Sequence, residues 1–114
     1  MKTVQYIVSM NELIHFVYSF IPTLNTITTL TFGDSFNERI DKINWRKLEG
    51  IYVIRFGKKF NQSLDHIWWS VTLREIHLNE RHTGSIENLV WTEGLKMLNR
   101  NAQFFTSRKV ESIT

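Results

Sequence analysis

Residues 27–45 read ITTLTFGDSFNERIDKINW, residues 51–69 read IYVIRFGKKFNQSLDHIWW, and residues 73–91 read LREIHLNERHTGSIENLVW. We refer to these segments as the first, second and third copies. A fourth copy begins at Leu95 and Leu98 and then decays. The same residue types recur at the same places in the three copies, so they decide how the chain folds.

Four columns of large apolar residues run through the copies. The first column is spaced by 24, 22 and 22 residues, and the tryptophan column by 24 and 22. The columns are Leu30, Ile54, Ile76 and Leu98; Ile40, Leu64 and Ile86; Ile43, Ile67 and Leu89; and Trp45, Trp69 and Trp91. Self-similarity at a period of about 20–30 residues is typical of solenoids, in which each unit buries its apolar edge against its neighbours. The columns therefore predict a mainly β solenoid of about three 22–24-residue coils.

Each copy starts with a short predicted strand. Leu30 and Phe32 alternate with threonine, and the other copies alternate in the same way, which is the pattern of a strand with one buried face. Strands that recur in the same direction at this spacing must lie parallel, one per coil. Gly33 and Gly57 follow two of the strands, where we expect a tight turn with positive φ. Asn79 takes this place in the third copy, as the next most tolerant residue.

A recurring dipeptide carries a resemblance to a known family. The Leu-Thr-Phe-Gly run at residues 30–33 is followed by Phe36-Asn37, and Phe60-Asn61 stands at the same place in the second copy. This pattern resembles the FNIP repeat, a relative of the leucine-rich repeats. The family's proline after Phe-Asn is absent from both copies.

The resemblance covers about residues 21–98 and is weaker in the third copy, where His82-Thr83 stands in place of Phe-Asn. It implies a short leucine-rich-repeat-like array with a parallel sheet, used for protein interaction. It brings no catalytic residues to carry over.

The segment before the copies is expected to cap them. Residues 3–8 alternate polar and apolar side chains, which favours a strand. Residues 11–20 are predicted to form a short amphipathic helix, with Ser9 or Asn11 as N-cap and Pro22 ending it. Four large apolar residues fall on one face of this helix. They are Leu13, Phe16, Val17 and Phe20.

The chain therefore divides into three predicted parts. Residues 1–22 form an N-terminal cap, residues 23–99 the repeat array, and residues 100–114 a C-terminal cap or tail. We expect Phe104 and Phe105 to fold over the last coil. If this end is incompletely covered, the open edge of the last strand can pair with another chain. Membership of a larger assembly would cover that edge.

Composition describes an ordinary single domain with no strong charge signal. Of the 114 residues, 42% are hydrophobic and 22% charged, which argues against disorder. The net charge of +3 comes from basic residues scattered among acids, so it does not indicate nucleic acid by itself. Cysteine is absent, which excludes disulfides and thiolate metal sites. With no recognisable secretory signal, this favours an intracellular, cytoplasmic location. The apolar run at residues 13–20 is shorter than the roughly 20 residues of a membrane span.

We find no constellation of residues that would support catalysis. Glu75 and His77 share a strand face, but two potential metal ligands without a third are weak evidence for a metal site. The acidic column Asp41, Asp65 and Glu87 repeats with the copies, which favours a solvated turn feature over paired catalytic carboxylates. No Gly-rich phosphate loop or Gly-x-Ser-x-Gly elbow is present. We expect no enzyme activity, no cofactor and no metal.

The asparagine and tryptophan columns are each interpreted as structural, and the tryptophan column also allows a binding role. Asn37 and Asn61 are expected to be buried and to bond the backbone of the adjacent coil. The tryptophan column is expected to pack in the core, although an exposed stacking platform for single-stranded nucleic acid is the alternative. Trp68 is next to Trp69 in the chain, so it should face outward and hints at an interface.

The resemblance implies that the outer face of the sheet is the binding surface. That face would present Thr29, Thr31, Val53, Arg55, Glu75, His77, Met97 and Asn99. The candidate partner-binding residues are Tyr52, Arg55, Trp68, Arg74, Glu75, His77 and Met97. Such a mixed, mildly basic face suits a protein partner better than a phosphate backbone, which wants several aligned cations.

We therefore predict a non-enzymatic repeat module that binds protein, as a small subunit of a larger assembly. Three alternatives stay open. One is a module that binds single-stranded nucleic acid. Another is a substrate adaptor in which residues 10–22 are the remnant of an F-box-like helix, since FNIP proteins often carry an F-box. The third is a decayed fragment of a longer repeat protein, without a function of its own.

Overall fold

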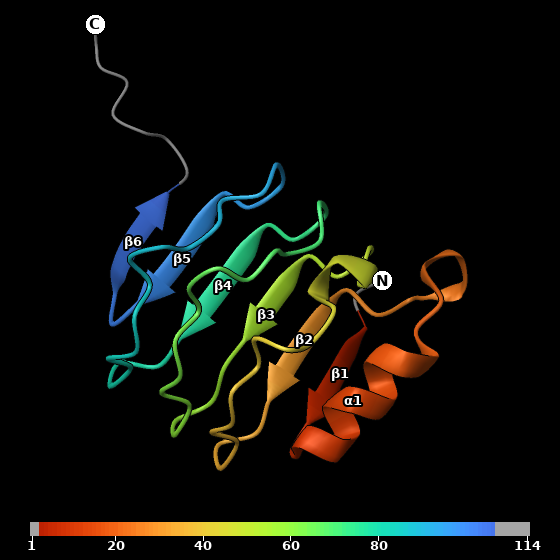
Figure 1. Ribbon diagram of the computed structural model, residues 1–114, viewed down its shortest axis with the longest axis horizontal. Coiled ribbons are helices and arrows are strands. Elements are labelled where there is room, and N and C mark those ends of the chain that lie inside the picture. The colour runs from red at the N-terminus through yellow and green to blue at the C-terminus, as the bar shows by residue number, and fades with distance from the viewer. Residues whose placement is uncertain (1–2, 107–114) are drawn as a thin grey trace, which may run out of the picture.

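The computed structural model describes residues 3–106, which form one six-stranded sheet and one α-helix (Figure 1). The strands are β1 Val4–Ile7, β2 Thr29–Phe32, β3 Val53–Arg55, β4 Glu75–Leu78, β5 Met97–Arg100 and β6 Gln103–Thr106. The helix α1 spans Met10–Ser19, and two short 3₁₀ helices, η1 and η2, span Pro22–Leu24 and Trp45–Lys47.

The strands lie side by side in chain order, as Figure 1 shows. β1 to β5 pair in parallel, and β6 returns antiparallel to β5. Leu30 pairs with Ile54, Ile54 with Ile76, and Ile76 with Leu98. The parallel pairing and the register predicted from the 24- and 22-residue spacings are therefore confirmed.

The core lies between one face of the sheet and the long connections that join the parallel strands. The strands contribute the columns of Leu30 and Phe32, and the connections contribute the columns of Phe36, Ile40 and Trp45. Aromatic rings stack from copy to copy in this space. The Phe32 and Phe56 centroids are 4.8 Å apart, those of Phe56 and Phe60 4.1 Å, and those of Trp45 and Trp69 5.2 Å. Large rings fill a wide core with few residues.

The last copy is less well covered than the first two. Ile40 and Leu64 are buried, whereas Ile86 in the same column is only partly buried, and Trp91 differs from Trp45 and Trp69 in the same way. The chain reverses at Asn101 and Ala102, both with positive φ, and continues as β6.

The prediction that Phe104 and Phe105 fold over the last coil is wrong for Phe104. It pairs with Asn99 and is 64% exposed, on the face of the sheet away from the core. Phe105 pairs with the buried Leu98 but is itself exposed. An alternating strand can turn only every second side chain towards one face, so the two phenylalanines cannot act together. The predicted polar tail at residues 107–114 lies outside the described residues.

The predicted N-terminal strand and helix are both present, with the helix one residue earlier than expected. Ser9 is the N-cap: its hydroxyl accepts a hydrogen bond from the Glu12 N–H, and the Glu12 carboxylate accepts one from the Val8 N–H. This reciprocal pair resembles a capping box, except that the carboxylate bonds the residue before the N-cap. At the other end, Lys47 Nζ donates to the carbonyls of Val17 and Tyr18 at 2.6 and 2.9 Å. A cation at the last helical carbonyls is favourable, and this one joins the helix to the first copy.

The expected role of Gly33 and Gly57 as positive-φ turn residues is wrong. Within residues 3–106 the glycine with positive φ is Gly50, at 106°. Gly57 is required for space instead, because a Cβ there would lie 2.5 Å from the Gly33 carbonyl oxygen. Asn79 in the third copy likewise has no positive φ; its amide donates to the Gly57 and Phe60 carbonyls, both at 2.9 Å.

We predict that Gly57→Ala destabilises the fold by about 1–3 kcal/mol, since overpacking against immobile backbone has this cost. Gly33→Ala is the matched control. Its Cβ would meet the tip of the Val8 side chain at 3.2 Å, which can move, so a clearly smaller loss is expected. Urea denaturation of the two variants measures the difference, and equal losses would contradict the close-approach argument.

Candidate functional site

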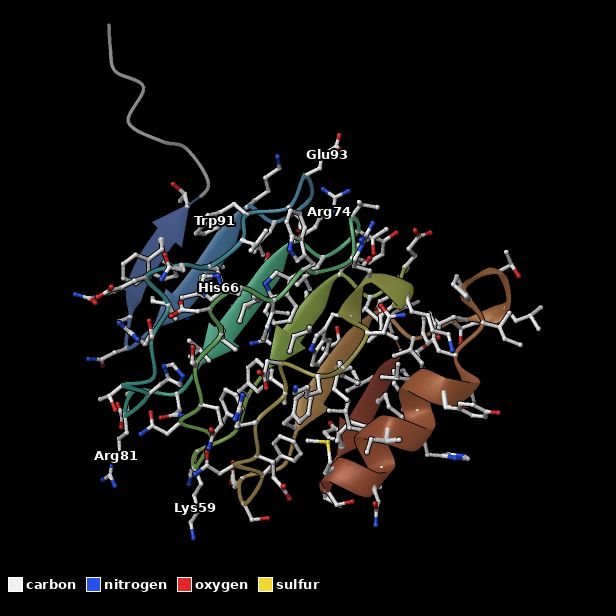
Figure 2. All side chains as sticks on the ribbon, in the orientation of Figure 1. Lys59, His66, Arg74, Arg81, Trp91 and Glu93 are labelled. Carbon is white, nitrogen blue, oxygen red and sulfur yellow. The ribbon has the colours of Figure 1, made fainter. Side chains whose placement is uncertain are left out.

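The face of the sheet away from the core carries two rows of side chains that run across all six strands. Strand register places each residue beside its neighbour in the row. One row is Val4, Thr29, Val53, Glu75, Met97 and Thr106, and the other is Tyr6, Thr31, Arg55, His77, Asn99 and Phe104. We call these twelve residues the outer face. Figure 2 shows the side chains on the ribbon.

A short polar chain occupies the middle of the outer face. His77 Nε2 lies 2.9 Å from Glu75 Oε1, and His77 Nδ1 lies 3.5 Å from Asn99 Nδ2. The Asn99 Oδ1 atom is buried and has no hydrogen-bond partner. A buried unpaired oxygen is unfavourable, so the Asn99 amide is a destabilising feature of this part of the face.

An aromatic and cationic pair flanks the outer face at the amino ends of the strands. The Arg74 guanidinium carbon lies 5.6 Å from the centre of the Tyr52 ring, within cation–π range. Tyr52 and Arg74 directly precede β3 and β4, and the Tyr52 carbonyl accepts the Arg74 and Glu75 N–H groups. Strand pairing therefore holds the two side chains beside one another.

The structure brings six of the seven predicted partner-binding residues together. Arg55, Glu75, His77 and Met97 lie on the outer face, and Tyr52 and Arg74 lie at its margin. Trp68 is exposed, as predicted, at 61%, but it lies on the connection between β3 and β4 and not on the sheet. Thr29, expected to be accessible, is buried between its neighbours in the row.

Two exposed aromatic residues on the outer face were not anticipated. Tyr6 and Phe104 stand at opposite ends of the same row, and each is 64% exposed. The alternation in residues 3–8 does not predict this for Tyr6, because it groups Tyr6 with the apolar Val4 against the polar Gln5; the pairing of β1 with β2 turns Gln5 and Ile7 towards the core and leaves Tyr6 outside. Phe104 has no comparable signal, because the hairpin that carries it follows the decay of the repeat pattern.

The asparagine column joins the copies but is exposed, so the predicted burial is wrong. Asn37 Oδ1 accepts hydrogen bonds from the Asn61 N–H at 2.8 Å and the Gln62 amide at 2.9 Å. Asn61 Oδ1 in turn accepts from the backbone N–H groups of Thr83 and Gly84. These bonds cross from one copy to the next, which is the backbone-pairing role that was predicted.

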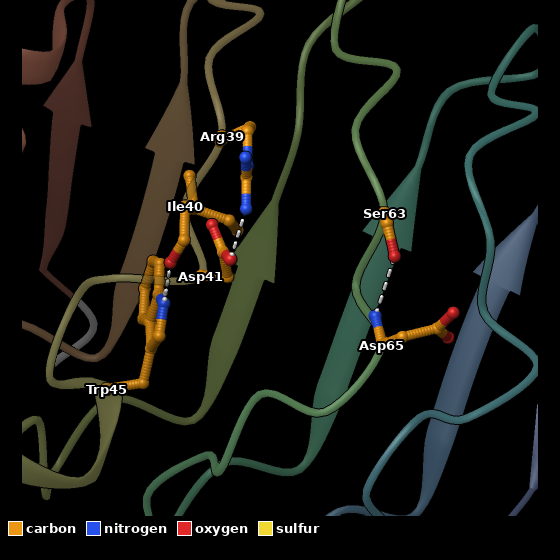
Figure 3. A network of polar contacts seen from close by, with 6 residues as sticks. All are labelled: Arg39, Ile40, Asp41, Trp45, Ser63 and Asp65. Carbon is orange, nitrogen blue, oxygen red and sulfur yellow. Dashed lines mark hydrogen bonds and ion pairs between the residues drawn. The ribbon is translucent and has the colours of Figure 1, made fainter.

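The acidic column is held by local contacts, within the first copy at Asp41 and from the third copy at Asp65. Asp41 pairs with Arg39 at 2.7 Å, and this hydrogen bond holds the pKa of the Asp41 carboxyl below its usual value (Figure 3). Burial raises the pKa of Asp65, but hydrogen bonds from the Ser85 side chain and the Asn88 backbone outweigh this, so that the net shift is downward. A catalytic acid needs the opposite shift.

The tryptophan column has no stacking surface in the first two copies. Trp45 and Trp69 are each 2% exposed, and the Trp45 indole N–H donates to the Ile40 carbonyl at 2.8 Å (Figure 3). Base stacking needs an accessible ring face. The predicted core packing is confirmed for these two residues, and the aromatic platform on which the nucleic-acid alternative was based is absent there.

Two further kinds of feature, a metal-binding cluster and a membrane-spanning helix, are absent from residues 3–106. In residues 3–106, no three His, Cys, Asp or Glu side chains come close enough together to hold a metal ion. Over the same part of the chain, no helix has the length and apolar character to cross a membrane.

Comparison with known proteins gives no match: no family model, no curated protein and no solved structure is similar to this chain. The function is therefore inferred from the sequence and geometry of this chain alone.

His82 is the one titratable group within residues 3–106 that is buried in the core. It takes the place of Phe36 and Phe60 in the third copy, and its ring stacks on Phe60 with centroids 5.8 Å apart. Its Nε2 lies 2.8 Å from the Gln62 carbonyl oxygen, and its Nδ1 lies 3.4 Å from an Arg100 nitrogen. Only the neutral ring with hydrogen on Nε2 satisfies both contacts. Burial and then the charge of Arg100 lower the pKa of His82, against an opposing effect of the Gln62 carbonyl.

We predict that His82 makes the fold sensitive to acid. Because folding lowers its pKa, the stabilisation is fully present above the unfolded value of about 6.5 and is lost as the pH falls through the lowered native pKa. His82→Phe should reduce the fall in unfolding free energy between about pH 7.5 and about pH 5.5, measured by urea denaturation. His15→Gln, at an exposed position on α1, is the control and should leave that fall unchanged. An unaltered pH dependence in His82→Phe would contradict the assignment.

Proposed function

We propose that this protein is a short solenoid of the FNIP, leucine-rich-repeat-like type, and that it binds a protein partner through its outer face as a small subunit of a larger assembly. The solenoid is supported by five successive strands that pair in parallel at the repeat spacing. It is also supported by side chains such as Asn37 and Asn79 that bond the backbone of the neighbouring copy. A stack of this kind buries each copy only against its neighbours.

The observation that carries the binding proposal is the composition and continuity of the outer face. Tyr6 and Phe104 supply exposed aromatic anchors at its two ends, and Arg55, His77 and Met97 lie between them. Tyrosine, phenylalanine, methionine and arginine are enriched at protein interfaces. No element of residues 3–106 lies over these rows, so a partner could contact several strands at once.

The face suits protein better than nucleic acid. Its cation on the strands is Arg55, with Arg74 and Lys96 at the margin, and Glu75 follows Arg74 directly in the chain. A phosphate backbone is bound by several cations along a track. A mixed surface with a polar centre and aromatic ends instead matches the anatomy of a protein interface.

We predict that the triple change Arg55→Ala, Glu75→Ala and His77→Ala weakens capture of the partner from the native source roughly tenfold or more, as loss of central interface residues does. Arg55 is exposed, and Glu75 and His77 are half-buried on the outer face, so circular dichroism checks that the triple variant remains folded. Trp68→Ala, on the connection away from the sheet, is the matched comparison. Loss of capture in Trp68→Ala with full capture in the triple variant would place the interface on the connections and overturn the proposal.

We predict that the isolated chain self-associates or needs its partner, because within residues 3–106 the Ile86 and Trp91 end of the core is only partly covered and no strand pairs with the outer edge of β6. Multi-angle light scattering over a range of concentrations measures this. A stable, monodisperse monomer would contradict the subunit role. The role of the outer face in partner binding is tested separately, by the triple alanine variant.

A further inference from the structure

A cleft separates the turn after β3 from the turn after β4, at the carboxyl ends of the strands. It has a volume of about 360 Å³ and is lined by Lys58, Lys59, Asn79, Glu80 and Arg81. Figure 2 shows Lys59 and Arg81 at the same end of the molecule, away from the ribbon. The outer face and the predicted partner-binding residues take no part in this cleft.

The stacking of the copies brings two like charges together here. Lys59 and Arg81 occupy the same place in the second and third copies, and the first copy has Ser35 there. All three residues are exposed. In residues 3–106 the salt bridges join Arg39 to Asp41 and Glu75 to His77, so neither Lys59 nor Arg81 is neutralised by one.

The neighbouring column of residues alternates in charge and does not repeat the like-charge pair. It consists of Asp34, Lys58 and Glu80, and opposite charges on adjacent copies favour stability. The Lys58 N–H also donates a hydrogen bond to Asp34 Oδ1 at 3.2 Å. Adjacent like charges are unfavourable by comparison. An anion placed between Lys59 and Arg81 would turn this repulsion into two attractions.

The backbone around the cleft is held in place before any ligand arrives. Asn79 donates to the Gly57 and Phe60 carbonyls in the preceding turn, and its Oδ1 accepts the Arg81 N–H at 2.7 Å. One side chain therefore fixes the spacing between the two turns and the backbone position of Arg81. Such preorganisation lowers the cost of binding.

We infer that the cleft binds a carboxylate side chain of an acidic peptide segment, with Arg81 and Lys59 as the cations that contact it. A guanidinium can accept a carboxylate through two parallel hydrogen bonds. A protein source is favoured over nucleic acid because the residues that line the cleft include no aromatic ring on which a base could stack. The inference deepens the proposed function by stating the chemistry of part of the partner.

The test is an amide NMR titration of the whole chain with a hexaglutamate peptide at low salt. We expect shifts concentrated at residues 57–59 and 79–81. The double variant Lys59→Gln, Arg81→Gln should weaken binding about fivefold or more, as expected for loss of two exposed ionic contacts. Lys42→Gln, Lys96→Gln is the control: it makes the same change in net charge at exposed positions elsewhere and should retain the affinity.

Three results would overturn the inference. Equal weakening of peptide binding in the two double variants would show that the effect comes from net charge alone. Amide shifts away from residues 57–59 and 79–81 would place the binding site elsewhere. Tighter binding of an oligothymidylate at the same turns would assign the cleft to nucleic acid. The triple alanine variant of the outer face should still bind the peptide. Failure of partner capture therefore tests the proposed function, and failure of the titration tests the cleft alone.

Discussion

The close approach of backbone between successive copies is the constraint on which this structure depends. At Gly57 the chain passes so near the Gly33 carbonyl that a single added carbon has no room. Parallel strand pairing sets the spacing at one side of each copy, and Asn37 and Asn61 set it at the turns through backbone hydrogen bonds. With both sides fixed, every side chain meets its equivalent one copy later.

The third copy shows how the same spacing is kept when the residues change. Asn79 replaces glycine and, with its side chain, bonds the carbonyls of the turn before it. His82 replaces phenylalanine and keeps the ring stack, but its two nitrogens must be satisfied by the Gln62 carbonyl and Arg100. Replacing an apolar ring by a titratable one makes the stability of this copy depend on protonation, since a buried charge is costly.

Stacking also creates both candidate binding surfaces. On the sheet, register aligns residues that are 22 or 24 positions apart into the rows of the outer face. At the turns, the same alignment sets Lys59 beside Arg81 and forms the basic cleft. Each surface can be altered without touching the core.

The sequence by itself determined the repeat and its register, because the columns of Leu30, Ile40 and Trp45 recur at spacings that only stacked parallel strands satisfy. It also predicted the N-terminal strand and helix from local signals, but left open whether Ser9 or Asn11 is the helix N-cap. The tertiary structure alone decided the role of Gly57, the partners of Asn79 and His82, and the hairpin that carries Phe104. These depend on what lies one copy away in space. A local pattern reports the conformation of its own segment, whereas a contact between copies exists only once the spacing between them is set.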